Sequence, residues 1–475
     1  MAPAKKKACT HQTVLIDASD YGRKTAGFQR VPVDKRIAAT TRSGRVPDGG
    51  ASSPRPVAAP DASTFPGPLV LPDDELALHP RYPPQSLRSW INGGYRNPIT
   101  HDRKTLYVAD VPRIDDTAAF MREWAEPDVE DLVDPAEFPR LQHPDTADLM
   151  GYLAAFYYPL EVKLLPTPMR FVRWKAGGKV DMVGLATGDT TVVGVRARPS
   201  KDEIARMQLN LSDLLDALMG EVPRDAYACV LVVAQDLYED EEDDFCCGRA
   251  FGGSRISVVS SFRYRPVLDL AFGVEVGHMW PLAHCARFVE GFCEEFEREN
   301  GEEGGGKRKR GGRAVSDGEA VLNLKKKPHT ALGAAIGAAK RVVVPKTKED
   351  QRGLWFSRVA RTAAHELGHC FGMDHCVYYA CVMQGTAGLG EDARQPPYLC
   401  PVCEARVLYG LGEMGVVEGG KGGRWVEGRQ GEVEKERMEA MRAFCEGWKG
   451  VGMFSGYWGW LGERMKQFDA DDRKF

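Results

Sequence analysis

The sequence contains no apolar run that approaches the length needed to cross a lipid bilayer, so we expect no membrane span. It also lacks an excess of charge of either sign, because 63 Lys and Arg stand against 67 Asp and Glu. A net charge of −4 favours neither nucleic acid nor an anionic membrane as a partner. The first 20 residues contain lysines but no apolar core, so we expect no secretory signal.

The chain does not have the composition of a small disulfide scaffold. Twelve cysteines in 475 residues suit a reducing compartment better than an oxidising one. We therefore expect an intracellular protein, cytoplasmic or nuclear and not secreted. With 43% hydrophobic and 27% charged residues, the chain has enough apolar material for a sizeable core.

The segment HELGHCFGMDH fills every defining position of the pattern HExxHxxGxxH. On a helix His365 and His369 lie one turn apart on the same face, a geometry that suits one zinc ion. Glu366 can reach water at that metal without being a ligand. Gly372 lets the chain leave the helix, and the turn returns His375 as a third nitrogen ligand. Three protein ligands leave one position for water, which is typical of a catalytic zinc site.

The residues around this motif favour the same interpretation. A chance HExxH would occur in about one such sequence in a hundred, and the full pattern in roughly a few in 100,000. The alternative is a pair of surface histidines on an amphipathic helix. One apolar stripe precedes and includes the motif, with the histidines on the opposite side of the helix. The stripe consists of Phe356, Ala360, Ala363, Leu367 and Cys370.

Four thiols follow the histidines. The pairs are separated by four and by two residues, with about eighteen residues between them, which is typical zinc-site spacing. Four thiolates close a tetrahedral shell, so this second zinc would be structural. The alternative is a pair of disulfides, which requires an oxidising compartment. The thiols belong to Cys376, Cys381, Cys400 and Cys403, and Met383 lies inside the segment that they enclose.

A complete HExxHxxGxxH followed by a methionine resembles the metzincin pattern, and the CxxxxC-x-M and CPxC elements resemble the archaemetzincin branch. The segments DDFCCGRAFGGSRISVVSSFRYRP and LWFSRVARTAAHELGHC add to the resemblance. It implies an α/β (α+β) metzincin-like catalytic domain with a twisted, mostly parallel sheet and an active-site helix. It also implies that the three histidines hold a catalytic zinc, that Glu366 is the general base, and that Met383 forms the Met-turn.

We divide the chain by composition and by this resemblance. Residues 1–68 are expected to be a disordered basic tail, and whether it targets an organelle stays open. Residues 69–158 extend the catalytic region, and residues 159–411 form the zinc metallopeptidase domain. That domain carries a flexible low-complexity insertion at 301–327. Residues 412–475 form a C-terminal extension with a flexible stretch and a terminal helix.

We expect a zinc-dependent metallopeptidase that cleaves peptides or proteins through a zinc-bound water activated by Glu366. The resemblance also suggests aminopeptidase activity. One alternative is a zinc-bound peptide-binding protein with little hydrolysis; another is a zinc-ribbon protein that binds nucleic acid through its cysteines and basic runs. The acidic charge and the complete motif argue against nucleic acid. The oligomeric state stays open.

Three further features leave alternatives. Residues 252–264 are either a cleft-edge strand that pairs with substrate, as the resemblance implies, or an internal strand. The acidic run at residues 239–244 either attracts basic substrates or faces water, and we favour water. Two histidines and two cysteines at residues 278–293 are expected to be core or capping residues rather than ligands of a third metal. The loop from Gln384 to Gly390 is expected to form a wall of the specificity pocket.

Overall fold

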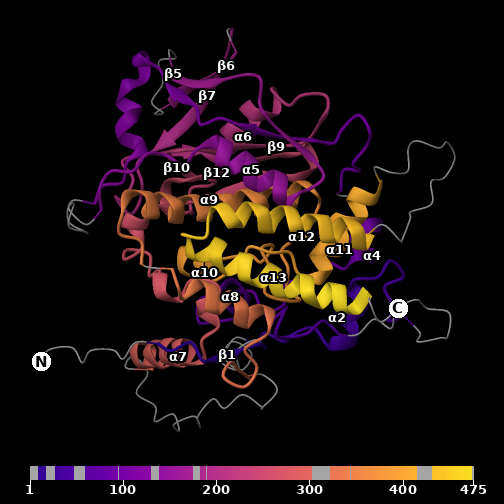
Figure 1. The fold of residues 1–475 in the computed structure, drawn as a ribbon. Coiled ribbons are helices and arrows are strands. Elements are labelled where there is room, and N and C mark those ends of the chain that lie inside the picture. Colours follow the sequence, from indigo (N-terminus) through magenta and orange to yellow (C-terminus); the bar gives the residue numbers. More distant parts are fainter. Residues whose placement is uncertain are drawn as a thin grey trace, which may run out of the picture.

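The structure is a computed structural model that describes ten stretches of the chain (Figure 1). These are residues 9–17, 27–47, 59–94, 96–129, 138–174, 182–188, 190–301, 321–342, 344–413 and 430–472. They form a mixed α/β fold with two larger sheets, a two-stranded ribbon and flanking helices. In the described part of the chain, no helix is both long and apolar enough to cross a membrane.

A five-stranded sheet supports the catalytic motif. Its β9 is an unbroken apolar run, and all eight of its residues are buried. Three of the four strand pairs are parallel, while β11 pairs antiparallel with β12 at one edge. This sheet therefore fits the expected mostly parallel arrangement. In spatial order the strands are β11 (Gly248–Phe251), β12 (Ile256–Ser260), β9 (Ala226–Val233), β2 (Thr105–Ala109) and β4 (Glu161–Leu164).

A second sheet, which the sequence did not lead us to expect, lies at the top of the view in Figure 1. Its central pairs are antiparallel. Together with α6 (Leu211–Met219), it packs its apolar side chains against one face of the five-stranded sheet. In spatial order the strands are β10 (Asp236–Tyr238), β8 (Gln208–Asn210), β7 (Thr191–Arg198), β6 (Met182–Thr187), β5 (Met169–Arg173) and β3 (Arg113–Ile114).

The other face of the five-stranded sheet packs against α9 (Lys348–Cys370) and α5 (Thr146–Phe156). Strand β9 serves both cores because alternate side chains point to opposite faces of a sheet. Val230 and Val232 join the α9 side, while Leu231 joins the α6 side. Helix α9 contacts β9, β12 and β11, and its last turn lies at the β11 edge of the sheet.

The C-terminal residues complete the core rather than extending from it. Helix α12 (Gln430–Gly447) packs on α5, and α13 (Gly452–Asp472) packs on α12 and α8 (Ala331–Ala339). The expected terminal helix is thus present as α12, but a second helix follows it. The flexible stretch predicted before it falls on residues 414–429, outside the described residues. Elsewhere in the described part, the helices are α2 (Val33–Ala39), α3 (Glu75–Leu78), α4 (Leu87–Asn92), α7 (Ala286–Gly301), α10 (Leu389–Ala393) and α11 (Pro401–Glu413).

The prediction of disorder across residues 1–68 is wrong for three described stretches of that segment. Strand β1 (Thr13–Leu15) pairs antiparallel with β13 (Val321–Asn323), and α2 buries its last three residues. Val14 is fully buried in a small cluster with apolar residues from β13 and α8. A partner about 300 residues away along the chain supplies the burial that this segment cannot provide alone. Most of the predicted insertion, residues 302–320, lies outside the described residues, while its end forms β13.

Candidate active site

Helix α9 places two imidazoles side by side at its C-terminal end. Nδ1 of His365 donates to the carbonyl oxygen of Val382, and Nδ1 of His369 donates to that of Met373, each at 2.7 Å. These bonds put the ring proton on Nδ1 and leave Nε2 as a lone-pair donor. The two Nε2 atoms face each other 3.0 Å apart. Two nitrogen lone pairs at this separation can coordinate the same metal cation.

A turn after α9 returns His375 to the same place. Gly372 has φ +76°, a conformation that favours glycine, and a Cβ there would lie 2.9 Å from Cα of Arg96. Gln85 fixes the turn, because its amide donates to the carbonyl of Gly372 and accepts from the backbone of Asp374. The ring of His375 lies 5.4 and 5.1 Å from the two helical imidazoles.

The three imidazoles form a set that could hold one metal ion. One ligand nitrogen from each of His365, His369 and His375 lies within 4.8 Å of the other two. Burial lowers the pKa of all three, and the neighbouring rings lower those of His365 and His375 further. The pKa of His375 falls to about 3. The neutral form, which is the metal-binding form of imidazole, is therefore favoured at neutral pH.

Glu366 lies between the histidines in sequence and faces β11. Burial raises the pKa of its carboxyl to about 8, although the cation of Arg249 opposes this shift. Gly248 makes room for the carboxylate, because a Cβ at this glycine would approach Oε1 to 2.9 Å. The carboxyl group also lines the cleft, beside the histidines. A buried, proton-exchanging group in this place has the position of a general base.

Met383 lies directly against the catalytic helix. A Cβ at Gly368 would clash with its sulfur, so only glycine permits this approach without a shift. The methionine is fully buried, and its carbonyl accepts a hydrogen bond from the backbone of Cys376 at 2.6 Å. Its predicted role as a Met-turn residue stays a prediction, but the contact places it next to the turn of helix that carries His369.

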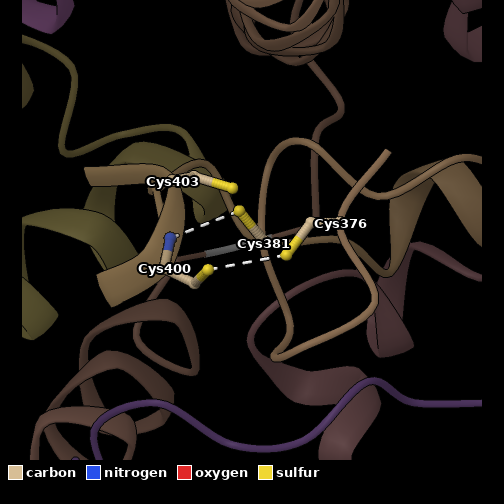
Figure 2. A group of neighbouring side chains, drawn as sticks. All are labelled: Cys376, Cys381, Cys400 and Cys403. Carbon is tan, nitrogen blue, oxygen red and sulfur yellow. Dashed lines mark hydrogen bonds between the residues drawn. The ribbon is translucent and has the colours of Figure 1, made fainter. Parts of the chain in front are cut away.

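The four predicted thiols come together in the interior (Figure 2). Their sulfurs lie within 4.8 Å of one another, and Sγ of Cys376 is 3.5 Å from Sγ of Cys400. This separation is far longer than a disulfide bond of about 2 Å, and all four cysteines are free. Cys400 and Cys403 stand at the start of α11, where the helix dipole favours negative sulfur. Arg406 adds a positive charge 3.7 Å from Sγ of Cys403.

The cleft above the histidines encloses about 760 Å³ between two walls. One wall is the segment after Gln384, of which Thr386, Ala387 and Gly388 line the cleft. The other wall is β11, an edge strand in the part of the chain that the structure describes. The cleft-edge interpretation of residues 252–264 is wrong, because their strand β12 is internal and pairs on both sides. The edge lies a few residues earlier in the sequence.

Sequence reasoning missed two residues that line the cleft. Arg249 projects from the edge strand and pairs with Glu239 at 3.2 Å. Tyr82 lies far upstream in the chain, yet its ring centroid is 5.7 Å from that of His375. The first belongs to a strand of only four residues, and the second to a loop, so neither has a sequence pattern that marks it.

The acidic run before β11 folds into a capped turn. The carboxylate of Asp243 accepts hydrogen bonds from the backbone of Glu239 and Asp240. Arg198 donates to two backbone carbonyls of the same turn. The carboxylates of Asp243 and Asp240 therefore accept hydrogen bonds from backbone N–H groups of the same turn, while Asp244 lines the cleft. The acidic run is therefore mainly a solvent-facing loop, as predicted, and one of its residues, Asp244, lies at the cleft.

Comparison with known proteins matches residues 328–408 to a family model described as Peptidase family M54. Archaemetzincin-2 of Homo sapiens is 23% identical over 370 residues, which cover 77% of this chain and 76% of that protein. Archaemetzincin of Aeropyrum pernix is 34% identical over 86 residues, 18% of this chain and 44% of that protein. A crystal structure of archaemetzincin from Methanopyrus kandleri covers 66% of this chain and 97% of its own, at 18% identity and a TM-score of 0.27.

Proposed function

The chain belongs to the archaemetzincin family and is a zinc metallopeptidase, and from this premise we propose how its residues act. We propose that His365, His369 and His375 hold a catalytic zinc ion. The observation that carries the proposal is the pair of Nε2 atoms 3.0 Å apart, each left as a lone-pair donor by its Nδ1 bond. Zinc bound there would polarise a peptide carbonyl and lower the pKa of water.

Glu366 would act as the general base. Its carboxyl lies in the cleft beside the histidines, and the missing side chain of Gly248 leaves room for the carboxylate there. It would take a proton from the attacking water and give a proton to the departing amine. Proton transfer of this kind contributes about 100- to 10,000-fold to the rate. Burial raises the pKa of its carboxyl, which makes the carboxylate form a stronger base, and a zinc ion held by the histidines would favour that ionised form.

The peptide backbone would lie along β11. As the last strand of the five-stranded sheet, it has one edge facing away from its partner β12. An extended peptide can add to such an edge through main-chain hydrogen bonds, which require no particular side chains on the substrate. Phe251 and Ala250 line the cleft beside this edge. The opposite wall, from Gln384 to Gly390, would then contact substrate side chains.

The four cysteines would hold a second, structural zinc ion. Four sulfur donors close the coordination shell and leave no position for substrate. Because Cys376 directly follows His375, this ion would fix the third histidine relative to α11. Cys376 also donates its backbone N–H to Met383, so the same ion would support the residue packed beneath the catalytic helix.

Aminopeptidase activity is the finer part of the proposal. Asp244 and Asp374 both line the cleft and are exposed, so either carboxylate could bind the free amino group of a substrate. Peptides that differ only in N-terminal acetylation test this point. An aminopeptidase loses cleavage of the acetylated peptide, whereas an endopeptidase cleaves both at similar rates.

The decisive test of the proposed function is Glu366→Gln, measured for zinc content and for turnover on a mixed peptide library. We expect the zinc ion at the three histidines and the zinc ion at the four cysteines both to remain, because the carboxylate of Glu366 is not a ligand. Turnover should fall about 100- to 10,000-fold. Glu290→Gln is the matched control, since this exposed glutamate on α7 undergoes the same change in charge away from the cleft.

Turnover in Glu366→Gln that stays within a few-fold of wild type would remove this residue from the mechanism. A wild-type protein that binds library peptides, measured by fluorescence anisotropy, but cleaves none would instead favour the zinc-bound peptide-binding alternative.

A further inference from the structure

A second group of metal-type side chains lies outside the catalytic region. One ligand atom from each of Cys9, His11 and His278 lies within 4.8 Å of the other two. A fourth member follows, because Sγ of Cys285 is only 2.9 Å from Sγ of Cys9. Cys9 and His11 precede β1, His278 ends the short 3-10 segment Val276–His278, and Cys285 directly precedes α7. Four soft or borderline donors therefore converge from three segments of the chain.

Both imidazoles in this group are oriented for metal binding. Nε2 of His11 donates to the carbonyl of Gly277 at 3.2 Å, and Nδ1 of His278 donates to the carboxylate of Glu275 at 2.9 Å. The opposite nitrogens, Nδ1 of His11 and Nε2 of His278, are buried and have no hydrogen-bond partner among the described residues. A histidine that donates one N–H to a carbonyl or carboxylate presents its other nitrogen as a ligand.

A buried ring nitrogen without a hydrogen-bond partner is destabilising, so these two nitrogens call for a partner. Water could satisfy the two nitrogens, but it does not explain the two thiols beside them. A divalent cation satisfies all four groups together.

Although the sequence led us to expect core or capping roles for His278 and Cys285, we propose that Cys9, His11, His278 and Cys285 bind a third zinc ion. Two sulfur and two nitrogen donors form a closed tetrahedral set, so the site is structural rather than catalytic. All four residues lie outside residues 328–408, the part matched by the family model. The proposal therefore does not depend on the catalytic zinc or on the four-cysteine site.

The ion would link the N-terminal segment that contains β1 to the residues that pack beneath the Gln384–Gly390 wall of the cleft. Val14 in β1 already forms a β-bridge with Cys285. Glu275 and His278 border a small cavity with Gly390 and Arg394, next to the helix α10 that ends the Gln384–Gly390 wall. The third zinc would thus hold β1, the start of α7 and the base of this wall together.

The test is zinc content of the full chain, purified under reducing conditions, measured by mass spectrometry of the metal. We expect Cys9→Ser to lose one zinc ion per chain relative to wild type. Cys293→Ser is the control, because it makes the same change at a cysteine that is buried on α7 and is not in the group, and it should lose none. An unfolded variant would lose every bound ion, so the loss of a single ion shows that the variant is still folded and that only this site is affected.

A second variant protects the test against local misfolding. The ring of His278 stacks on Phe288 at 4.2 Å, so His278→Phe keeps an aromatic ring in place and removes only the nitrogens. It should also lose one zinc ion. Equal zinc content in wild type and both variants overturns the proposal. So does a Cys9–Cys285 disulfide found by peptide mapping in protein purified with reductant, because it would consume two ligands.

Discussion

The contact between Gly252 and the catalytic helix gives the sharpest mutational prediction. This glycine begins the short turn Gly252–Ser254 that joins β11 to β12. A Cβ at this position would collide with the carbonyl oxygen of His369 and lie 3.3 Å from its carbonyl carbon. Both colliding groups belong to the main chain, so no change of side-chain rotamer relieves the overlap. The side-chain amide of Asn97 also holds the carbonyl of Gly252 at 3.0 Å.

Gly252→Ala must therefore separate the edge strand from the last turn of α9. Overpacking of this kind costs about 1–3 kcal/mol of unfolding free energy. The larger effect concerns catalysis, because the displaced carbonyl of His369 accepts the N–H of Gly372 at 2.9 Å, at the turn that leads to His375. A displacement of about 1 Å between catalytic groups costs about 100-fold in rate. We expect kcat/KM to fall by about that factor.

Gly253→Ala is the matched control, since a Cβ there meets nothing within 4 Å and its φ is not positive. Both variants change one glycine of the same turn to alanine, so their difference isolates the collision with His369. Urea unfolding measures the stability term, and steady-state peptide cleavage measures the rate term. Equal stability and equal turnover for the two variants would refute the close packing of this turn on the helix.

Two further predictions concern buried polar groups away from the cleft. Burial lowers the pKa of His143 from 6.5 to about 4. Between pH 4 and pH 6.5 this histidine is therefore protonated in the unfolded chain but neutral in the folded chain. Unfolding free energy measured against pH should therefore fall from pH 6.5 to 4, by up to about 3 kcal/mol from this group, and His143→Gln should remove that part of the slope. Arg263 is paired both with the fully buried Asp236 and with Asp202, so Asp236→Asn removes one of its two carboxylates and should cost less in urea unfolding than the about 3–5 kcal/mol of a buried charge left with no partner.

The catalytic helix could be predicted because its signals are local. The apolar stripe from Phe356 to Cys370 is buried as expected, and a capping box at Thr347 and Asp350 starts the helix. The zinc motif and the cysteine spacing predict two ligand sets, and the structure brings the members of each set together. Their roles as ligands stay predictions.

The parts that sequence reasoning missed depend on contacts between distant residues. The edge strand β11 has four residues and no alternation strong enough to separate it from a loop, whereas the β-branched residues of its neighbour β12 give a clear strand pattern. Helix α6 begins at Leu211, although apolar residues at helical spacing already begin at Ile204. Residues 208–210 instead pair with β7 and β10, a tertiary choice that overrides local propensity.

The packing of α13 has a practical consequence for anyone who works with part of this chain. Phe454, Trp460 and Leu461 are almost completely covered, although all three lie beyond the segment that identifies the family. Gly459 lets α13 come so close to α8 that a methyl group there would strike the carbonyl of Ala334 at 2.7 Å. A fragment trimmed to the recognisable peptidase segment would lose this cover and present bare aromatic and aliphatic surface, which promotes aggregation.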